Sequence, residues 1–140
     1  MQASPLLGPV MGLVIWTAVM WCWMYATRIP AITRMKMRLD PNAPRGEQMS
    51  QLPAHVRWKA DNYNHLFEQP TLFYATALVL AILNDRSTVS VALAWLYVAL
   101  RVVHSIWQAT KNVIIVRFAL FSLSSLVLYG LVIKAALRVF

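Results

Sequence analysis

Charged residues are scarce in this chain, and acidic residues are the scarcest. Only 13% of the 140 residues are charged, with five Asp and Glu against 13 Lys and Arg, while 59% are hydrophobic and the mean hydropathy is +0.55. A soluble domain of this size carries about 25% charged residues, so the composition excludes an ordinary soluble fold. It also argues against nucleic-acid binding, because that function needs a basic face on a soluble module.

Cysteine occurs only once, at Cys22. A single thiol cannot form an intrachain disulfide or a zinc site, and we interpret Cys22 as a small apolar filler. The chain also has no internal repeat, no low-complexity run and no sign of a second domain. Residues 1–140 are therefore expected to form one domain.

Four long apolar stretches account for the missing charge: Leu6–Ala26, Leu66–Leu83, Val89–Trp107 and Val113–Val132. Each approaches the roughly 20 residues that a helix needs to cross the hydrocarbon core of a bilayer. The first stretch does not resemble a secretory signal, because its basic residues follow the apolar run and no small-residue cleavage site is present. The sequence predicts an all-α integral membrane protein with four transmembrane helices.

The basic residues predict the orientation of these helices. Lys111 and Arg117 flank the third connection, and seven further basic residues lie in the first: Arg28, Arg34, Lys36, Arg38, Arg45, Arg57 and Lys59. By the positive-inside rule, the first and third connections face the cytoplasm and both termini face the opposite side. Lys134 and Arg138 run against this pattern but are outnumbered. The net charge of +8 thus indicates topology and contact with anionic lipids.

Polar residues interrupt the third apolar stretch at regular intervals. Arg101, His104, Ser105, Gln108 and Lys111 recur every three or four positions, so on a helix they form one stripe. A cation deep in an apolar helix costs several kcal/mol unless it is paired or lines a polar cavity. We therefore expect a polar partner opposite Arg101.

A second polar cluster precedes the second apolar stretch. We predict one continuous helix from near Pro53 through Leu83, kinked at Pro70. On this helix the side chains at positions 61, 64, 65 and 68 share a face, at spacings of three and four.

Three interpretations of the two clusters remain open. Glu68 could form a buried ion pair with Arg101 or Arg117 that fixes the register of the helices. Alternatively, both stripes could assemble a pocket for an anionic or zwitterionic ligand. The third interpretation is a metal site built from His65, Glu68 and His104 on two helices.

These residues resemble the MAPEG family, the membrane-associated proteins in eicosanoid and glutathione metabolism. The most specific match is Arg101-x-x-His104-Ser105, with Arg117 sixteen positions after Arg101. The block Phe67-Glu68-x-Pro70-x-Leu72-Phe73-Tyr74 is similar to the bacterial branch of the family. The resemblance covers essentially the whole chain.

The resemblance implies a left-handed four-helix bundle that assembles as a homotrimer in the inner membrane of a bacterium, with both termini periplasmic. It implies that glutathione binds between adjacent subunits, near the cytoplasmic end. In that site Arg117 would be the catalytic residue that stabilises the thiolate, and no metal would be needed. The candidate glutathione-binding residues are Arg101, Glu68, Asn64, Asn62, His104 and Gln108, with Arg28 or Arg34 supplied by the neighbouring subunit.

The implied function is a glutathione transferase or peroxidase that acts on lipophilic electrophiles delivered by the lipid phase. Three positions depart from the family pattern: Asp61 replaces an arginine, Gln108 a tyrosine, and Phe118 a serine that some members carry. Because Asp61 should weaken binding of an anionic ligand, two alternatives stay open. One is a non-catalytic membrane scaffold or accessory subunit, and the other is a binder of a different anionic amphiphile.

Overall fold

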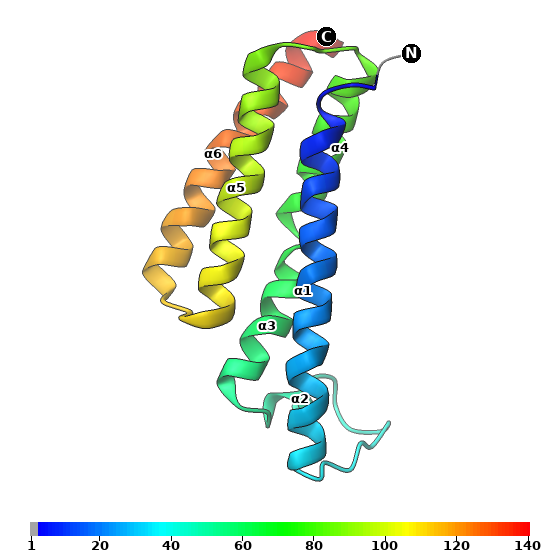
Figure 1. The fold of residues 1–140 in the computed structure, drawn as a ribbon, viewed down its shortest axis with the longest axis vertical. Coiled ribbons are helices and arrows are strands. Elements are labelled where there is room, and N and C mark those ends of the chain that lie inside the picture. Colours follow the sequence, from blue (N-terminus) through cyan, green and yellow to red (C-terminus); the bar gives the residue numbers. More distant parts are fainter. Residues whose placement is uncertain (1–2) are drawn as a thin grey trace.

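The computed structural model describes residues 3–140, which form six helices and no β-strand (Figure 1). The helices are α1 (Leu7–Arg34), α2 (Glu47–Ser50), α3 (Ala54–His65), α4 (Gln69–Ile82), α5 (Thr88–Thr110) and α6 (Ile114–Val139). Helices α3 and α4 follow one another alongside α1, and α5 packs against α6. Both termini lie at one end of the bundle, the termini end. The α1–α3 connection lies at the other end, the loop end, and the α5–α6 turn lies on the same side of the bundle but well short of that connection.

Three helices are long and apolar enough to cross a membrane: α1, α5 and α6, with 28, 23 and 26 residues. At about 1.5 Å per residue, each exceeds the roughly 30 Å of a hydrocarbon core. Large apolar side chains cover their outer surfaces; Ile115, Leu126 and Leu137 are 76%, 71% and 78% exposed. Such a surface suits contact with lipid. These helices confirm an all-α membrane protein, whereas a fourth crossing, at Leu66–Leu83, stays a prediction.

The predicted continuous helix from Pro53 to Leu83 is wrong, because the chain breaks between His65 and Gln69. Proline has no N–H, and its ring collides with the carbonyl four residues earlier in a helix. A new helix, α4, therefore begins at Gln69 with Pro70 in its first turn, and Glu68 takes non-helical angles (φ −85°, ψ −99°). The Thr71 hydroxyl donates to the Glu68 carbonyl over 2.6 Å. The expected kink is thus a full break over residues 66–68, whose backbone N–H groups make turn hydrogen bonds to the last residues of α3.

The apolar core lies toward the termini end. Phe73 of α4 and Tyr97 of α5 are fully buried, and their rings stack at 4.6 Å between centroids. Leu13 of α1 and Leu128 of α6 close the same core. Farther along α5 toward the loop end, the buried residues become polar from Arg101 onward. This change places the candidate site in the loop-end half of the bundle.

A buried carboxylate joins the α4–α5 loop to the last helix. Asp85 is 1% exposed and accepts hydrogen bonds from the Ser90 hydroxyl at 2.6 Å and the Ser87 N–H at 2.9 Å. Lys134 and Arg138 of α6 approach it at 3.5 Å and 3.8 Å. The two basic residues that run against the predicted orientation are therefore paired with an acid.

We expect the Asp85 cluster to make stability depend on pH. Desolvation raises the pKa of Asp85, but the hydrogen bonds from Ser90 and Ser87 and the charge of Lys134 outweigh it and hold the pKa below its usual range. A carboxyl with a depressed folded pKa stabilises the protein above its unfolded pKa of about 3.9. That contribution is lost as the pH falls through the folded pKa. Asp85→Asn should cost about 1–3 kcal/mol at neutral pH.

Thermal unfolding in detergent, followed from neutral to acid pH, tests this prediction. The difference in melting temperature between wild type and Asp85→Asn should begin to decrease below about pH 4. Glu47→Gln alters an exposed residue of α2; it is the matched control and should have the melting temperature of the wild type. A difference that stays constant down to the lowest pH would contradict the role assigned to Asp85.

Candidate functional site

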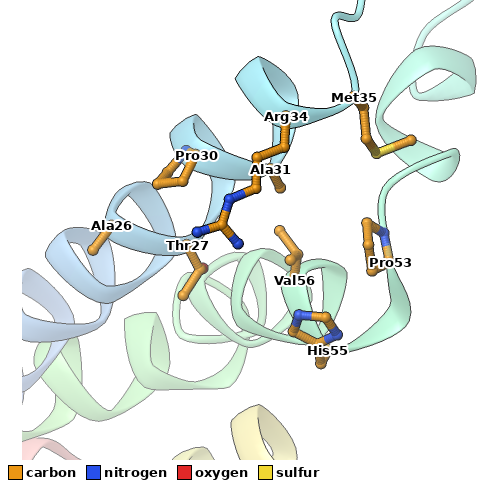
Figure 2. A pocket seen from close by; sticks show the side chains of 9 residues that line it. All are labelled: Ala26, Thr27, Pro30, Ala31, Arg34, Met35, Pro53, His55 and Val56. Carbon is orange, nitrogen blue, oxygen red and sulfur yellow. The ribbon is translucent and has the colours of Figure 1, made fainter.

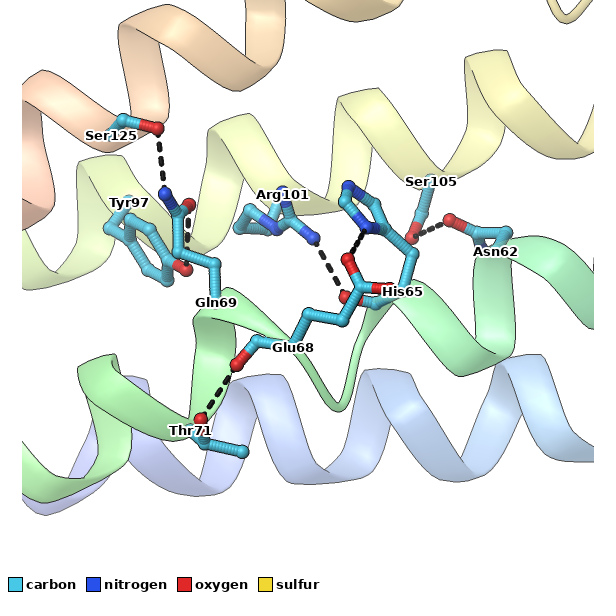
Figure 3. Close-up of polar contacts among 9 residues, drawn as sticks. All are labelled: Asn62, His65, Glu68, Gln69, Thr71, Tyr97, Arg101, Ser105 and Ser125. Atoms are coloured by element: carbon cyan, nitrogen blue, oxygen red, sulfur yellow. Dashed lines mark hydrogen bonds and ion pairs between the residues drawn. The ribbon is translucent and has the colours of Figure 1, made fainter.

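Arg101 is the most deeply buried cation of the protein, with 0% of its surface exposed. Its Nη2 donates to the backbone carbonyl of His65 over a long 3.4 Å (Figure 3), and the guanidinium lies 5.9 Å from the centroid of the Phe121 ring. Within residues 3–140, its Nε and Nη1 find no hydrogen-bond partner. A buried charge with unpaired donors is costly. Arg101 is therefore the candidate cation for binding an acceptor group of a ligand.

His65 and Glu68 lie at the two ends of the break between α3 and α4. His65 is the last residue of α3, and its Nδ1 lies 2.5 Å from the Glu68 carboxylate, as Figure 3 shows. No ion pair joins Glu68 to Arg101 or Arg117 in the part of the chain that the structure describes. The alternative in which Glu68 forms a buried ion pair with one of these arginines is therefore not formed within the described residues. Because the helix unwinds here, Glu68 turns back onto its own helix end.

Hydrogen bonds on both sides of Arg101 tie the broken helix to α5. Toward the loop end, the Ser105 hydroxyl donates to Asn62 Oδ1 at 3.0 Å, and both residues are fully buried. Toward the termini end, Gln69 accepts from the Tyr97 hydroxyl at 3.4 Å and donates to Ser125 at 2.6 Å. Figure 3 shows these contacts on either side of Arg101. The two links hold the α3–α4 break against α5 and α6.

A cleft of about 360 Å³ opens beside Arg101. It is lined by His65, His104, Ile114, Arg117, Phe118 and Phe121. His65 and Phe121, which both contact Arg101, form its inner wall, and the half-buried Arg117 lies on α6. Arg117 Nη1 donates to Asn112 Oδ1 at 2.8 Å. Asn112 lies in the α5–α6 turn in the left-handed region (φ 52°), so this turn positions the second guanidinium.

His104 and Gln108 complete the buried face of α5, as the polar stripe predicts. Both are at most 3% exposed, and His104 Nδ1 and Gln108 Oε1 lack hydrogen-bond partners within the described residues. The rings of His104 and His65 lie 5.2 Å apart. The structure thus brings the α5 stripe, the end of α3 and the start of α6 to one place.

Other predicted site residues lie elsewhere in the protomer. Arg28 and Asn64 line a different cleft of about 390 Å³, together with Arg45, Arg57 and Asp61. Arg34 lines a third, of about 380 Å³, together with His55 (Figure 2). The side chains at positions 61, 64, 65 and 68 were predicted to share one helix face, but the structure places them in two different regions. Asp61 and Asn64 belong to the second cleft, whereas His65 and Glu68 adjoin Arg101.

His65 lines the cleft, although the sequence indicated it only as a metal ligand and not as a glutathione-binding residue. Its spacing to Glu68 placed it on a polar face, but the same spacing holds for Asp61 and Asn64. At the break after α3, the Glu68 carboxylate lies 2.5 Å from the imidazole Nδ1. No group of three His, Cys, Asp or Glu side chains in residues 3–140 could hold a metal ion, so the alternative metal site at His65, Glu68 and His104 is not formed.

The Asn62–Ser105 hydrogen bond offers a test of how the site is held together. Asn62→Ala should lower the free energy of unfolding by about 1–3 kcal/mol, because it leaves the buried Ser105 hydroxyl without its partner. In a double-mutant cycle, Asn62→Ala and Ser105→Ala should show a coupling of roughly 1 kcal/mol. Asn64→Ala is the matched control, since Asn64 is exposed. Additive effects at Asn62 and Ser105 would contradict the contact.

The fold and the site together define a class: an integral membrane protein whose helices hold a buried arginine beside a cleft. A family model described as the MAPEG family matches residues 6–137, nearly the whole chain. The chain therefore belongs to the MAPEG family, as its motifs predicted, and membership supports a membrane role related to glutathione in the broad sense. Searches of the curated proteins and of the solved structures gave no match.

Proposed function

We propose that this protein binds glutathione within the membrane and activates its thiol for attack on lipophilic electrophiles, as a transferase or a peroxidase. The observation that carries the proposal is the buried guanidinium of Arg101, whose Nε and Nη1 have no partner among residues 3–140. Family membership makes glutathione the ligand to test first.

The charges of the site match those of the tripeptide. Glutathione carries two carboxylates and one ammonium, so its site needs at least two cations and one anion. Arg101 and Arg117 supply guanidinium groups, which bind carboxylates in a bidentate manner. Glu68 uses one oxygen for His65 and is 67% exposed, so its second oxygen can accept from the ammonium.

Arg117 is the residue that we propose for activation of the sulfur. It lines the cleft together with Ile114, Phe118 and Phe121, which form an apolar surface open to a lipophilic second substrate. A fixed cation near the sulfur lowers the pKa of the bound thiol and raises the fraction of nucleophilic thiolate. Carbon–sulfur bond formation, or attack on a peroxide, then starts from that thiolate.

The proposal includes a homotrimer in a bacterial inner membrane, with the loop end cytoplasmic. Arg28 and Arg34 line clefts other than the one beside Arg101 in their own protomer, so they would contribute to glutathione binding only from a neighbouring subunit. The apolar outer faces of α1, α5 and α6 would then be shared between lipid and subunit contacts. Crosslinking in native membranes and mass measurement in detergent test the trimer.

Titration of the detergent-solubilised protein with glutathione tests the proposed function. We expect a saturable ultraviolet absorbance of thiolate, together with saturable heat by calorimetry. S-methylglutathione is the matched ligand, because it keeps both carboxylates but has no ionisable thiol; it should compete for the site and give no thiolate absorbance. A folded protein that shows neither signal would exclude glutathione and favour the scaffold. A different co-purified amphiphile, identified by mass spectrometry, would favour the third alternative.

A further inference from the structure

The pairing of His65 with Glu68 gives the cleft an oriented imidazole. Nδ1 of His65 lies 2.5 Å from Glu68 Oε2. Because an ionised carboxylate only accepts hydrogen bonds, Nδ1 carries the proton and Nε2 has a free lone pair. A carboxylate that orients an imidazole in this way is the arrangement by which proteins fix the tautomer of a general base.

Nε2 of His65 is open to the cleft. Within residues 3–140 it makes no hydrogen bond. It is also not one of the buried polar atoms without a partner, so it is accessible from outside the protein. His65 also lines the cleft that holds Arg117. A thiol bound in that cleft would therefore meet both a cation and a proton acceptor.

The other charged and titratable groups around His65 come from the helices packed on α3. Arg101 of α5 donates to its carbonyl, and His104 of α5 lies 5.2 Å away between ring centroids. Arg117 of α6 lines the same cleft, and Phe121 of α6 lies 5.5 Å from the imidazole ring. Burial lowers the pKa of His65, Glu68 raises it, and the two guanidinium groups lower it further, so that the pKa lies below its usual range.

We propose that His65 is the proton acceptor for the bound thiol and that Glu68 is its positioning residue; this inference rests on the proposed function. The S–H bond of glutathione breaks, its electron pair stays on sulfur, and the proton forms an N–H bond at Nε2 of His65. The products are a thiolate beside Arg117 and an imidazolium that donates from Nδ1 to Glu68. Glu68 keeps its negative charge throughout.

Internal transfer suits a site of low dielectric constant. Ionisation to bulk solvent would add a net negative charge to a buried site, and a change of buried charge is expensive. Transfer to His65 leaves the total charge of the site unchanged and creates two opposite charges, each with a partner. The imidazolium can return its proton to the leaving group or to the reduced peroxide oxygen at the end of the reaction.

A measurement of proton release during glutathione binding tests the proposal on the wild-type protein. Thiolate absorbance and proton release to a weakly buffered medium are measured together at neutral pH. We expect thiolate to form with almost no proton released, because His65 retains it. Release of one proton for each thiolate would overturn the proposal while leaving the proposed function intact. Absence of thiolate and of binding would instead refute the proposed function, and the proposal with it.

Variants then separate His65 from its neighbours. His65→Gln should lower turnover at neutral pH by about 100-fold, the usual scale of general-base catalysis, and its rate should rise with pH as solvent replaces the base. Glutathione affinity by calorimetry should change by less than about threefold, on the scale at which tenfold equals about 1.4 kcal/mol. Glu68→Gln should give a smaller loss of turnover.

Two histidines serve as comparisons. His55→Gln alters an exposed histidine of the same helix α3 that lines a different cleft, and it should leave turnover and proton release unchanged. His104→Gln alters the other histidine of the cleft. If His104→Gln produces the pH-dependent loss and His65→Gln does not, the assignment of His65 is overturned.

Discussion

Replacing Arg101 with methionine should weaken glutathione binding by about 100-fold, equivalent to about 2.7 kcal/mol, without destabilising the protein. Arg101 has one long hydrogen bond, of 3.4 Å, to the His65 carbonyl, and two nitrogens without partners in the described chain. A buried charge so poorly paired adds little to stability, and an apolar replacement of similar volume is often neutral or stabilising. A ligand carboxylate, in contrast, would lose its buried partner, which costs about 2–5 kcal/mol.

Calorimetric titration with glutathione and a thermal unfolding curve for each variant check both parts of this prediction. Arg138→Met is the matched control: it removes an arginine at the termini end that pairs with Asp85 at 3.8 Å, so it should leave glutathione affinity unchanged. The scaffold alternative predicts the reverse for Arg101→Met, with a clear loss of stability and no effect of glutathione on either protein. The two measurements therefore distinguish a binding residue from a structural one.

The sequence predicted the buried polar stripe of α5 because that stripe depends only on helical periodicity. Four members lie on the buried face at 0–3% exposure: Arg101, His104, Ser105 and Gln108. The fifth, Lys111, is exposed because α5 ends at Thr110. The membrane class followed from composition for the same reason, since long apolar helices need no tertiary information to be recognised. Three of the predicted crossings correspond to α1, α5 and α6.

The α3–α4 break and its consequences could not be predicted from spacing alone. Pro70 signals a disturbance of the helix, but a kink and a complete break leave the same sequence signal. The outcome decides which side chains meet. At the broken helix end the Glu68 carboxylate lies 2.5 Å from His65, whereas Asp61 and Asn64 line a different cleft.

Contacts between segments far apart in the sequence could not be predicted either. Asp85 and Lys134 lie at 3.5 Å, although no local pattern relates a loop to the end of the last helix. The same holds for Arg28 and Arg34, which the family resemblance assigned to the glutathione site. They line clefts of their own in the protomer, and only the arrangement of subunits could bring either one to Arg101.

Arg117→Met should separate binding of glutathione from activation of its thiol. Arg117 is half-buried on the wall of the cleft and is held by Asn112 at 2.8 Å. An opposite charge within a few ångströms favours the ionised form of a group by a factor of about 10 to 1,000. We therefore expect the thiolate absorbance of bound glutathione at neutral pH to fall by roughly 10- to 100-fold. Affinity, measured with S-methylglutathione, should fall by less than about tenfold, or about 1.4 kcal/mol.

Arg117→Lys provides the matched control, because it keeps a positive charge in the cleft but loses the planar guanidinium that Asn112 orients. It should retain part of the thiolate signal, whereas Arg117→Met should retain almost none. An unchanged thiolate signal in Arg117→Met would assign activation to Arg101 instead. Equal losses of affinity for glutathione and for S-methylglutathione, with a normal thiolate fraction in what still binds, would make Arg117 a carboxylate ligand. The thiolate fraction and the affinity must therefore be measured on the same variants, since only their ratio shows which guanidinium faces the sulfur.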